Sequence, residues 1–91
     1  MRHEPRFSRA AINRAIEQVA YNHNLDVKTL MQPCRFKHVV YARWDLWDTM
    51  LKIGAPYAEI ARVTGYDHST VIHGIKLFRK GVMPYDKGNT A

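Results

Sequence analysis

The sequence predicts an all-α fold, a small helical domain that ends in a helix-turn-helix. Apolar residues recur at spacings of three and four along several segments, which is the periodicity of amphipathic helices. Residues that favour helix starts precede these segments, and glycine or proline follows them. No segment alternates apolar and polar residues as a strand does. A chain of 91 residues with a hydrophobic fraction of 46% fits one packed domain.

Two helices are expected in the first third of the chain. Ser8 is the expected N-cap of the first, which ends near the asparagines of "YNHNL". The apolar stripe of this helix is formed by Ile12, Ile16 and Val19. Asp26 is the expected N-cap of a short second helix over residues 27–31, and Pro33 stops it.

A longer central helix is expected from Val39 to Ile53, with Gly54 as its stop. The basic segment "CRFKH" connects it to the short helix before it. Its main apolar positions are Val39, Val40, Leu46, Trp47, Met50, Leu51 and Ile53. Two tryptophans in one helix of a small domain indicate a core element rather than a binding platform.

The last two helices are predicted to form a close pair. Pro56 is expected as the first residue of a short helix that Gly65 closes. Asp67 is the expected N-cap of the next helix, which runs to about Lys80 and is ended by Gly81. A short helix, a glycine turn and a second helix form the helix-turn-helix pattern. We expect one core that contains Trp47, Met50, Ile60, Val71, Ile75 and Phe78.

The domain is expected to cover residues 8–80, between a flexible N-terminus at 1–7 and a flexible tail at 81–91. No apolar run approaches the roughly 20 residues that span a membrane. The N-terminal residues also lack the apolar core of a signal peptide. We therefore expect a cytoplasmic protein that does not bind a membrane.

The charge of the chain favours a polyanionic partner. The formal net charge is +6 and the isoelectric point is near 9.8. Domains this basic favour polyanions, most often nucleic acid and less often a membrane surface. A basic protein that is merely soluble would have the same composition.

Enzymatic and metal-binding roles find little support in the sequence. The single cysteine, Cys34, excludes an intramolecular disulfide and a cysteine-based zinc site. His68 and His73 differ by about 140° around a helix, so they cannot face one ion. The sequence has neither a glycine-rich phosphate loop with its lysine nor a Ser-His-acid motif. We expect no metal, no cofactor, no bound nucleotide and no catalytic residue.

The face of the last helix opposite its apolar stripe is polar and basic. It carries Ser69, His73, Lys76 and Lys80, with no acidic residue after Asp67. A helix in the DNA major groove presents its first turns to base edges, while basic residues around them meet phosphates. An ordinary solvated helix face would also be polar, so this pattern alone leaves both interpretations open.

The segment "PYAEIARVTGYDHSTVIHGIKLFRK" resembles the C-terminal DNA-binding domain of the bacterial replication initiator DnaA. The upstream segment "AINRAIEQVAYNHNLDVKTLM" resembles the linking helix and short helix of that family, so the resemblance extends from about Ala10 to Lys80. It implies a Trp-repressor-like helix-turn-helix fold and double-stranded DNA as the partner. The family signature at the start of the recognition helix is matched by Asp67, His68, Ser69, Thr70, Val71 and His73.

The resemblance and the helix faces together assign expected roles at the interface. Base-reading residues are expected in the first turns of the last helix: Asp67, His68, Ser69, Thr70 and His73. The residues expected to meet the DNA backbone or the minor groove are Arg35, Lys37, Arg62, Lys76 and Lys80. Of these, Arg35 and Lys37 are assigned by the resemblance, which directs the loop before the central helix toward the minor groove.

Two departures from the family pattern affect specificity. Gly65 and Tyr66 stand where the family has two glycines and an arginine, so the turn is one residue shorter. The strongly basic loop of the family is reduced to "CRFKH". We therefore do not transfer the usual target sequence of the family to this chain.

The ATPase module of the initiator is also missing from these residues. We therefore expect a stand-alone DNA-binding domain that regulates transcription or replication initiation by occupying its site. The alternative is a helical module that docks on a protein of the replication or transcription machinery. RNA binding is a weaker alternative, because the sequence has no glycine-loop or sheet-type RNA motif. The oligomeric state is left open.

Overall fold

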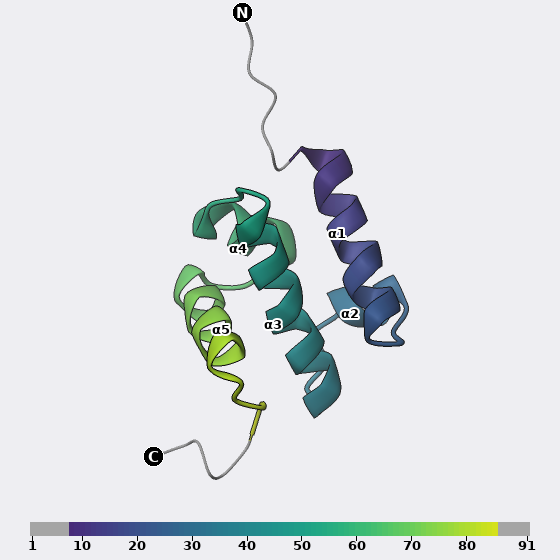
Figure 1. Cartoon of the computed structure of the whole chain (residues 1–91), viewed down its shortest axis with the longest axis vertical. Helices are drawn as coiled ribbons and strands as arrows, with labels where there is room; N and C mark the ends of the chain where they lie inside the picture. Colours follow the sequence, from purple (N-terminus) through teal and green to yellow (C-terminus); the bar gives the residue numbers. More distant parts are fainter. Residues whose placement is uncertain (1–7, 86–91) are drawn as a thin grey trace, which may run out of the picture.

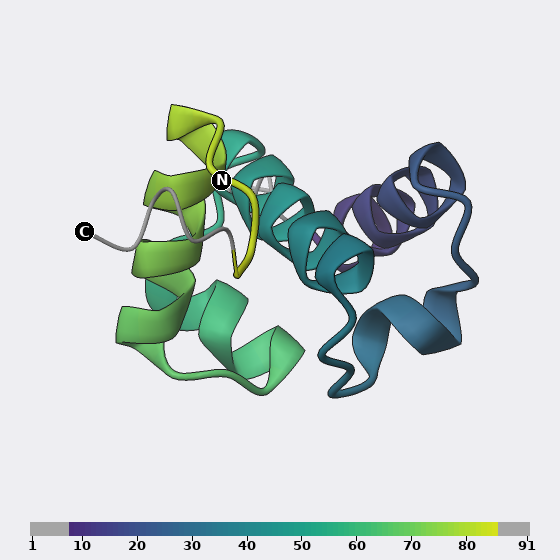
Figure 2. The same cartoon turned by 90° about the horizontal axis from the view of Figure 1, so that it is seen from below.

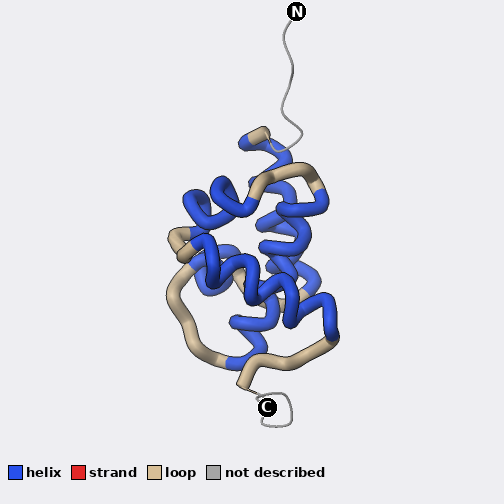
Figure 3. The backbone as a smooth tube through the Cα atoms, turned by 90° about the vertical axis from the view of Figure 1, so that its left-hand side faces the viewer, coloured by secondary structure: helices blue, strands red, loops and turns tan. Residues whose placement is uncertain are grey.

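The computed structural model describes residues 8–85, and its elements confirm the all-α prediction (Figure 3). The helices are α1 (Arg9–Asn22), α2 (Val27–Met31), α3 (Lys37–Lys52), α4 (Tyr57–Thr64) and α5 (His68–Lys80). Helix α3 is central and packs against each of the other four. Helices α1 and α5 lie on opposite sides of it (Figures 1 and 2). Helix α5 packs on α3 and on α4, which fixes the helix-turn-helix pair to the core.

The ends of α1, α4 and α5 follow the capping signals of the sequence. Ser8 caps α1, because its Oγ accepts a hydrogen bond from the backbone N–H of Ala11 at 3.3 Å. Gly65 ends α4 with φ +78°, and Gly81 ends α5 with φ +79°. This left-handed backbone favours glycine over any residue with a Cβ.

Asp26 occupies the N-cap position of α2, as expected, but its side chain does not cap the backbone. Its Oδ1 instead accepts a hydrogen bond from Thr29 Oγ1 at 3.1 Å. The helix ends at Met31, just before Pro33, which confirms the predicted range.

Two predicted helix starts were wrong by one or two residues. Helix α3 begins at Lys37 instead of Val39, because Phe36 takes the N-cap position and its carbonyl accepts bonds from the next turn. Pro56 is the N-cap of α4 rather than its first residue. Its ψ of 159° is extended, and its carbonyl accepts the N–H of Ile60 at 3.0 Å. Proline has the φ that both positions need, so the sequence did not distinguish them.

The predicted core is confirmed for five of its six residues. These five belong to one buried cluster: Trp47, Met50, Ile60, Val71 and Ile75. Phe78 was assigned to this core wrongly. It is half-buried and lies outside this cluster, and its ring centroid is 5.2 Å from that of Tyr41. Along α3, Val40, Leu51 and Ile53 are also only half-buried, whereas Arg43 and Asp48 are buried.

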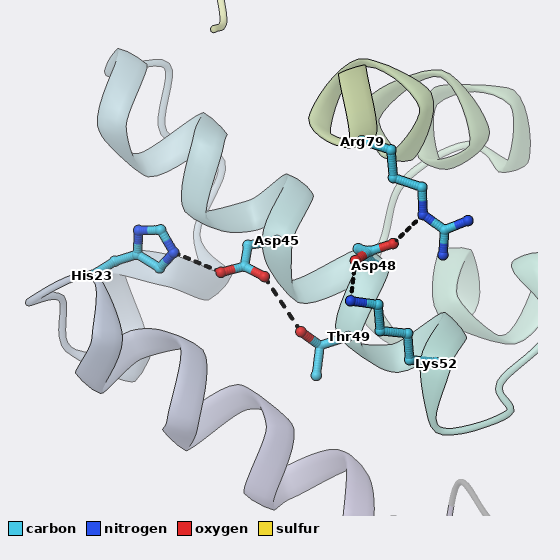
Figure 4. Close-up of polar contacts among 6 residues, drawn as sticks. All are labelled: His23, Asp45, Asp48, Thr49, Lys52 and Arg79. Atoms are coloured by element: carbon cyan, nitrogen blue, oxygen red, sulfur yellow. Dashed lines mark hydrogen bonds and ion pairs between the residues drawn. The ribbon is translucent and has the colours of Figure 1, made fainter. Parts of the chain in front are cut away.

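Buried and half-buried carboxylates fasten the outer helices to α3 (Figure 4). Asp48, which is 2% exposed, accepts from Arg79 Nε of α5 at 2.6 Å and lies 3.2 Å from Lys52 Nζ. Oδ2 of Asp45 lies 2.8 Å from Nε2 of His23, which is the residue just after α1. A buried charge that loses its partner is strongly destabilising, so the Asp48–Arg79 pair helps to fix the orientation of α5.

The described chain continues past α5 in contact with the fold. The N–H of Val82 donates to Leu77 O at 3.0 Å, and the side chain of Pro84 is buried. The expectations for residues 1–7 and for 86–91 fall outside the described residues. None of the helices in the described part is both long and apolar enough to cross a membrane.

Candidate nucleic-acid interface

The turn between α4 and α5 consists of Gly65, Tyr66 and Asp67 alone. The N–H groups of Gly65 and Tyr66 both donate to Ala61 O, at 2.8 and 3.1 Å. Asp67 then has an extended backbone, and its carbonyl accepts the first bond of α5, from Val71. The backbone bonds therefore close α4 and open α5 within three residues, which leaves little freedom in the angle between the two helices.

Tyr66 fastens this turn to the core. Its ring lies edge-on to Trp47 with centroids 5.4 Å apart, and the guanidinium of Arg43 lies 5.0 Å from its centroid on the ring face. Contacts of both kinds stabilise a half-buried ring in one orientation. The residue that departs from the family pattern thus has a structural role in this chain.

The first turns of α5 present the residues predicted to read bases. The predicted set is exposed throughout: Asp67, His68, Ser69, Thr70 and His73. The side chain of Asp67 makes no capping hydrogen bond, so its carboxylate is not used to cap the helix. The ring of His68 lies edge-on to Tyr57 of α4, with centroids 5.9 Å apart and an interplanar angle of 81°. This contact restricts the ring at the start of α5.

Lys76 and Lys80 are exposed further along α5, on the face that carries His73. The neighbouring Arg79 is also exposed, but its Nε donates to the buried Asp48 of α3. In the last turns of α5, Arg79 therefore anchors the helix to α3, whereas Lys76 and Lys80 face solvent.

The loop before α3 is tied to the helix-turn-helix by Arg43. This arginine is 6% exposed, and its Nη2 donates to Gln32 O at 2.7 Å and to Cys34 O at 3.2 Å. The same guanidinium lies over the ring of Tyr66. Arg43 thus connects two segments of the candidate interface, the loop over residues 32–36 and the turn before α5, which lie on one side of the molecule (Figure 2). Arg35 in this loop and Lys37 at the start of α3 are exposed.

Arg62 lies outside the loop and the turn that Arg43 connects. It pairs with Glu59 one turn earlier on α4, and its Nε donates to Glu59 Oε1 at 3.1 Å. The hydrogen bond lowers the pKa of Glu59 below its usual value and raises the pKa of Arg62 above its own. Both side chains line a groove between α1 and α4. The pair uses Nε and Nη2 of Arg62, which leaves Nη1 of this exposed side chain to donate to a phosphate.

The sequence did not reveal that Arg43 and Tyr66 join the segments of the candidate interface. A signal for Arg43 exists, because it lies four residues after Val39 and four before Trp47, on the buried stripe of α3. An arginine in an apolar stripe indicates a buried charge with local partners. No sequence signal identifies those partners as the carbonyls of Gln32 and Cys34.

A short helix, a glycine turn and a second helix with exposed polar first turns define a helix-turn-helix domain. The family described as bacterial DnaA protein helix-turn-helix matches residues 12–77. The chain belongs to this family, and the membership indicates DNA binding. No curated protein and no solved structure matches the chain at a significant level.

Proposed function

We propose that the protein binds double-stranded DNA sequence-specifically and regulates transcription or replication initiation by occupying its sites, in the cytoplasm and without enzymatic activity. The observation that carries this proposal is the exposed Asp67–Thr70 segment on the first turn of α5, in a member of the DnaA helix-turn-helix family. Recognition helices of this class read base edges with these positions. The net charge of +6 supports a polyanionic partner.

Each residue of the first turns has a chemistry that suits base edges. The carboxylate of Asp67 can accept a hydrogen bond from the amino group of cytosine. The methyl group of Thr70 and the ring of His68 suit contacts with thymine methyl groups. Ser69 and His73 add hydrogen-bonding groups on the same exposed surface.

The test of the proposal is selection from a random duplex library. An enriched motif supports sequence-specific readout, and a steep fall of affinity with salt supports phosphate contacts. A palindromic motif indicates a dimer, and a single asymmetric motif indicates a monomer. If no motif is enriched and the affinity for duplex DNA does not depend on salt, the results would favour the alternative, a protein-docking module.

His68→Ala and Thr70→Ala should each relax sequence preference at one or two positions of the selected motif. We expect each to cost about 1–3 kcal/mol in binding to the preferred duplex, because a base contact is lost. Repeating the selection with both variants measures this. Gln18→Ala, at an exposed position of α1, is the control. Identical motifs for the wild type and both variants would show that these two residues do not read bases.

Lys76→Ala and Lys80→Ala should weaken binding to the selected duplex and to random duplexes alike. Loss of one phosphate contact should lower the slope of log affinity against log salt by about 1. Titrations at several salt concentrations measure the slope. Arg14→Ala, which removes an exposed charge from α1, should leave the slope unchanged. A Lys76→Ala protein with an unchanged slope and an altered motif would make Lys76 a base reader.

A further inference from the structure

Phe36 is a large aromatic side chain that the fold leaves in solvent. It is 70% exposed at the N-cap of α3, and its ring is stacked parallel to His38 with centroids 6.4 Å apart. Its backbone is ordered by the helix, since Phe36 O accepts the N–H groups of Val39 and Val40, both at 2.9 Å. The core therefore gains little from a phenylalanine here, and the exposed ring is held on a rigid base.

The surroundings of Phe36 are basic. Arg35 and Lys37 flank it and are both exposed, and the sequence from Gln32 to Trp44 contains no acidic residue. An aromatic face between cations suits a polyanion with flat apolar faces, which is the chemistry of nucleic acid bases. An apolar pocket on a protein would match the ring but would not account for the paired charges.

The position of Phe36 relative to α5 selects a duplex as the partner. Arg43 fastens the preceding residues of this loop, through Gln32 O and Cys34 O, to Tyr66 in the turn before α5. The loop and this turn lie on one side of the molecule (Figure 2). When the first turns of α5 occupy the major groove, a loop on the same side of the protein meets the neighbouring backbone and minor groove. Apolar side chains at such places insert between base pairs in other DNA-binding proteins and kink the duplex.

We propose that Phe36 is a wedge that partly unstacks one base step beside the site read by α5 and bends the duplex there. The proposal rests on the proposed function, because α5 must first place the loop. Arg35 and Lys37 neutralise the phosphates on either side of the step. Flexible pyrimidine–purine steps cost least to deform, so the wedge adds a preference for such a step at a fixed distance from the motif.

The experiment uses the full chain and the duplex selected by it, with 2-aminopurine placed at successive positions outside the motif. Wild-type protein should raise the fluorescence at one step and bend the duplex in an energy-transfer assay. Phe36→Ala should abolish both signals and weaken specific binding about tenfold, the size of a lost base–aromatic contact. The slope of log affinity against log salt should stay unchanged, since no charge is removed.

Two further variants separate the wedge from other roles of the position. Phe36→Leu should retain part of the bend, because leucine also acts as an apolar wedge. Tyr21→Ala, which removes a ring that is 79% exposed on α1, should change neither signal. Thermal melts of all variants should match the wild type, since the side chains are exposed.

The outcomes distinguish the two proposals. Selected binding by the wild type without unstacking or bending, or with bending that persists in Phe36→Ala, overturns the wedge and leaves the proposed function intact. Failure of the wild type to select any duplex overturns both. Loss of bending in Phe36→Ala together with an unchanged α5 motif supports the wedge.

Discussion

Replacing Val71 or Ile75 by alanine should lower the free energy of unfolding by about 2–4 kcal/mol. The two side chains are 0% and 2% exposed, and both belong to the cluster that joins α5 to Trp47 and Met50 of α3. Truncation removes buried methyl groups and leaves a cavity, and the packed rings around it can fill that space only in part. Thermal and denaturant unfolding of the two variants measures the loss.

Ile72→Ala is the matched control for Ile75→Ala, because it makes the same substitution one turn away. Ile72 is half-buried, so it should cost clearly less than Ile75. Equal losses for Ile72 and Ile75, or melts unchanged by Val71→Ala and Ile75→Ala, would contradict the orientation of α5. The exposed reading face would then be assigned wrongly as well, since it is defined as the opposite face of this helix.

The helices could be predicted from the sequence because their signals are local. Ser8 is a hydroxyl residue before an apolar stripe, and Gly65 and Gly81 supply the left-handed backbone that ends a helix. The exposure of the first turns of α5 followed from the period of its apolar residues. Such features depend on neighbours within one or two turns, which a sequence displays directly.

The remaining features depend on contacts between distant segments. Periodicity placed Phe78 on the inner face of α5, yet its ring lies outside the buried cluster and packs beside Tyr41. Arg62 lines a groove that residues of α1 and α4 form together, although its ion pair with Glu59, three residues earlier on α4, is local. The link from Arg43 to the loop over residues 32–36 and to Tyr66 requires knowledge of how α3 crosses the turn. No local pattern encodes the contact of Phe78 with Tyr41, the groove between α1 and α4, or the link through Arg43.

Gly74 is another position whose role only the packing reveals. It is buried in the middle of α5, where glycine costs about 1 kcal/mol of helix propensity relative to alanine. A Cβ atom at this position would lie 2.5 Å from Cζ3 of Trp47 and 2.7 Å from Cδ1 of Trp44. Both distances are too short for carbon atoms, so α5 crosses α3 at a separation that only glycine permits.

Gly74→Ala should therefore destabilise the protein by about 2 kcal/mol, although it improves helix propensity, because overpacking against a buried indole costs more. The indole of Trp47 is 2% exposed and cannot move aside without displacing its neighbours, whereas that of Trp44 is half-buried and can turn outward. A double-mutant cycle with Trp47→Leu tests this reason, with denaturant unfolding as the measurement. In the leucine background the alanine should cost little or become stabilising, since the six-membered ring that it meets is gone. An equal cost in both backgrounds would show that the loss comes from the α5 backbone and not from its approach to Trp47.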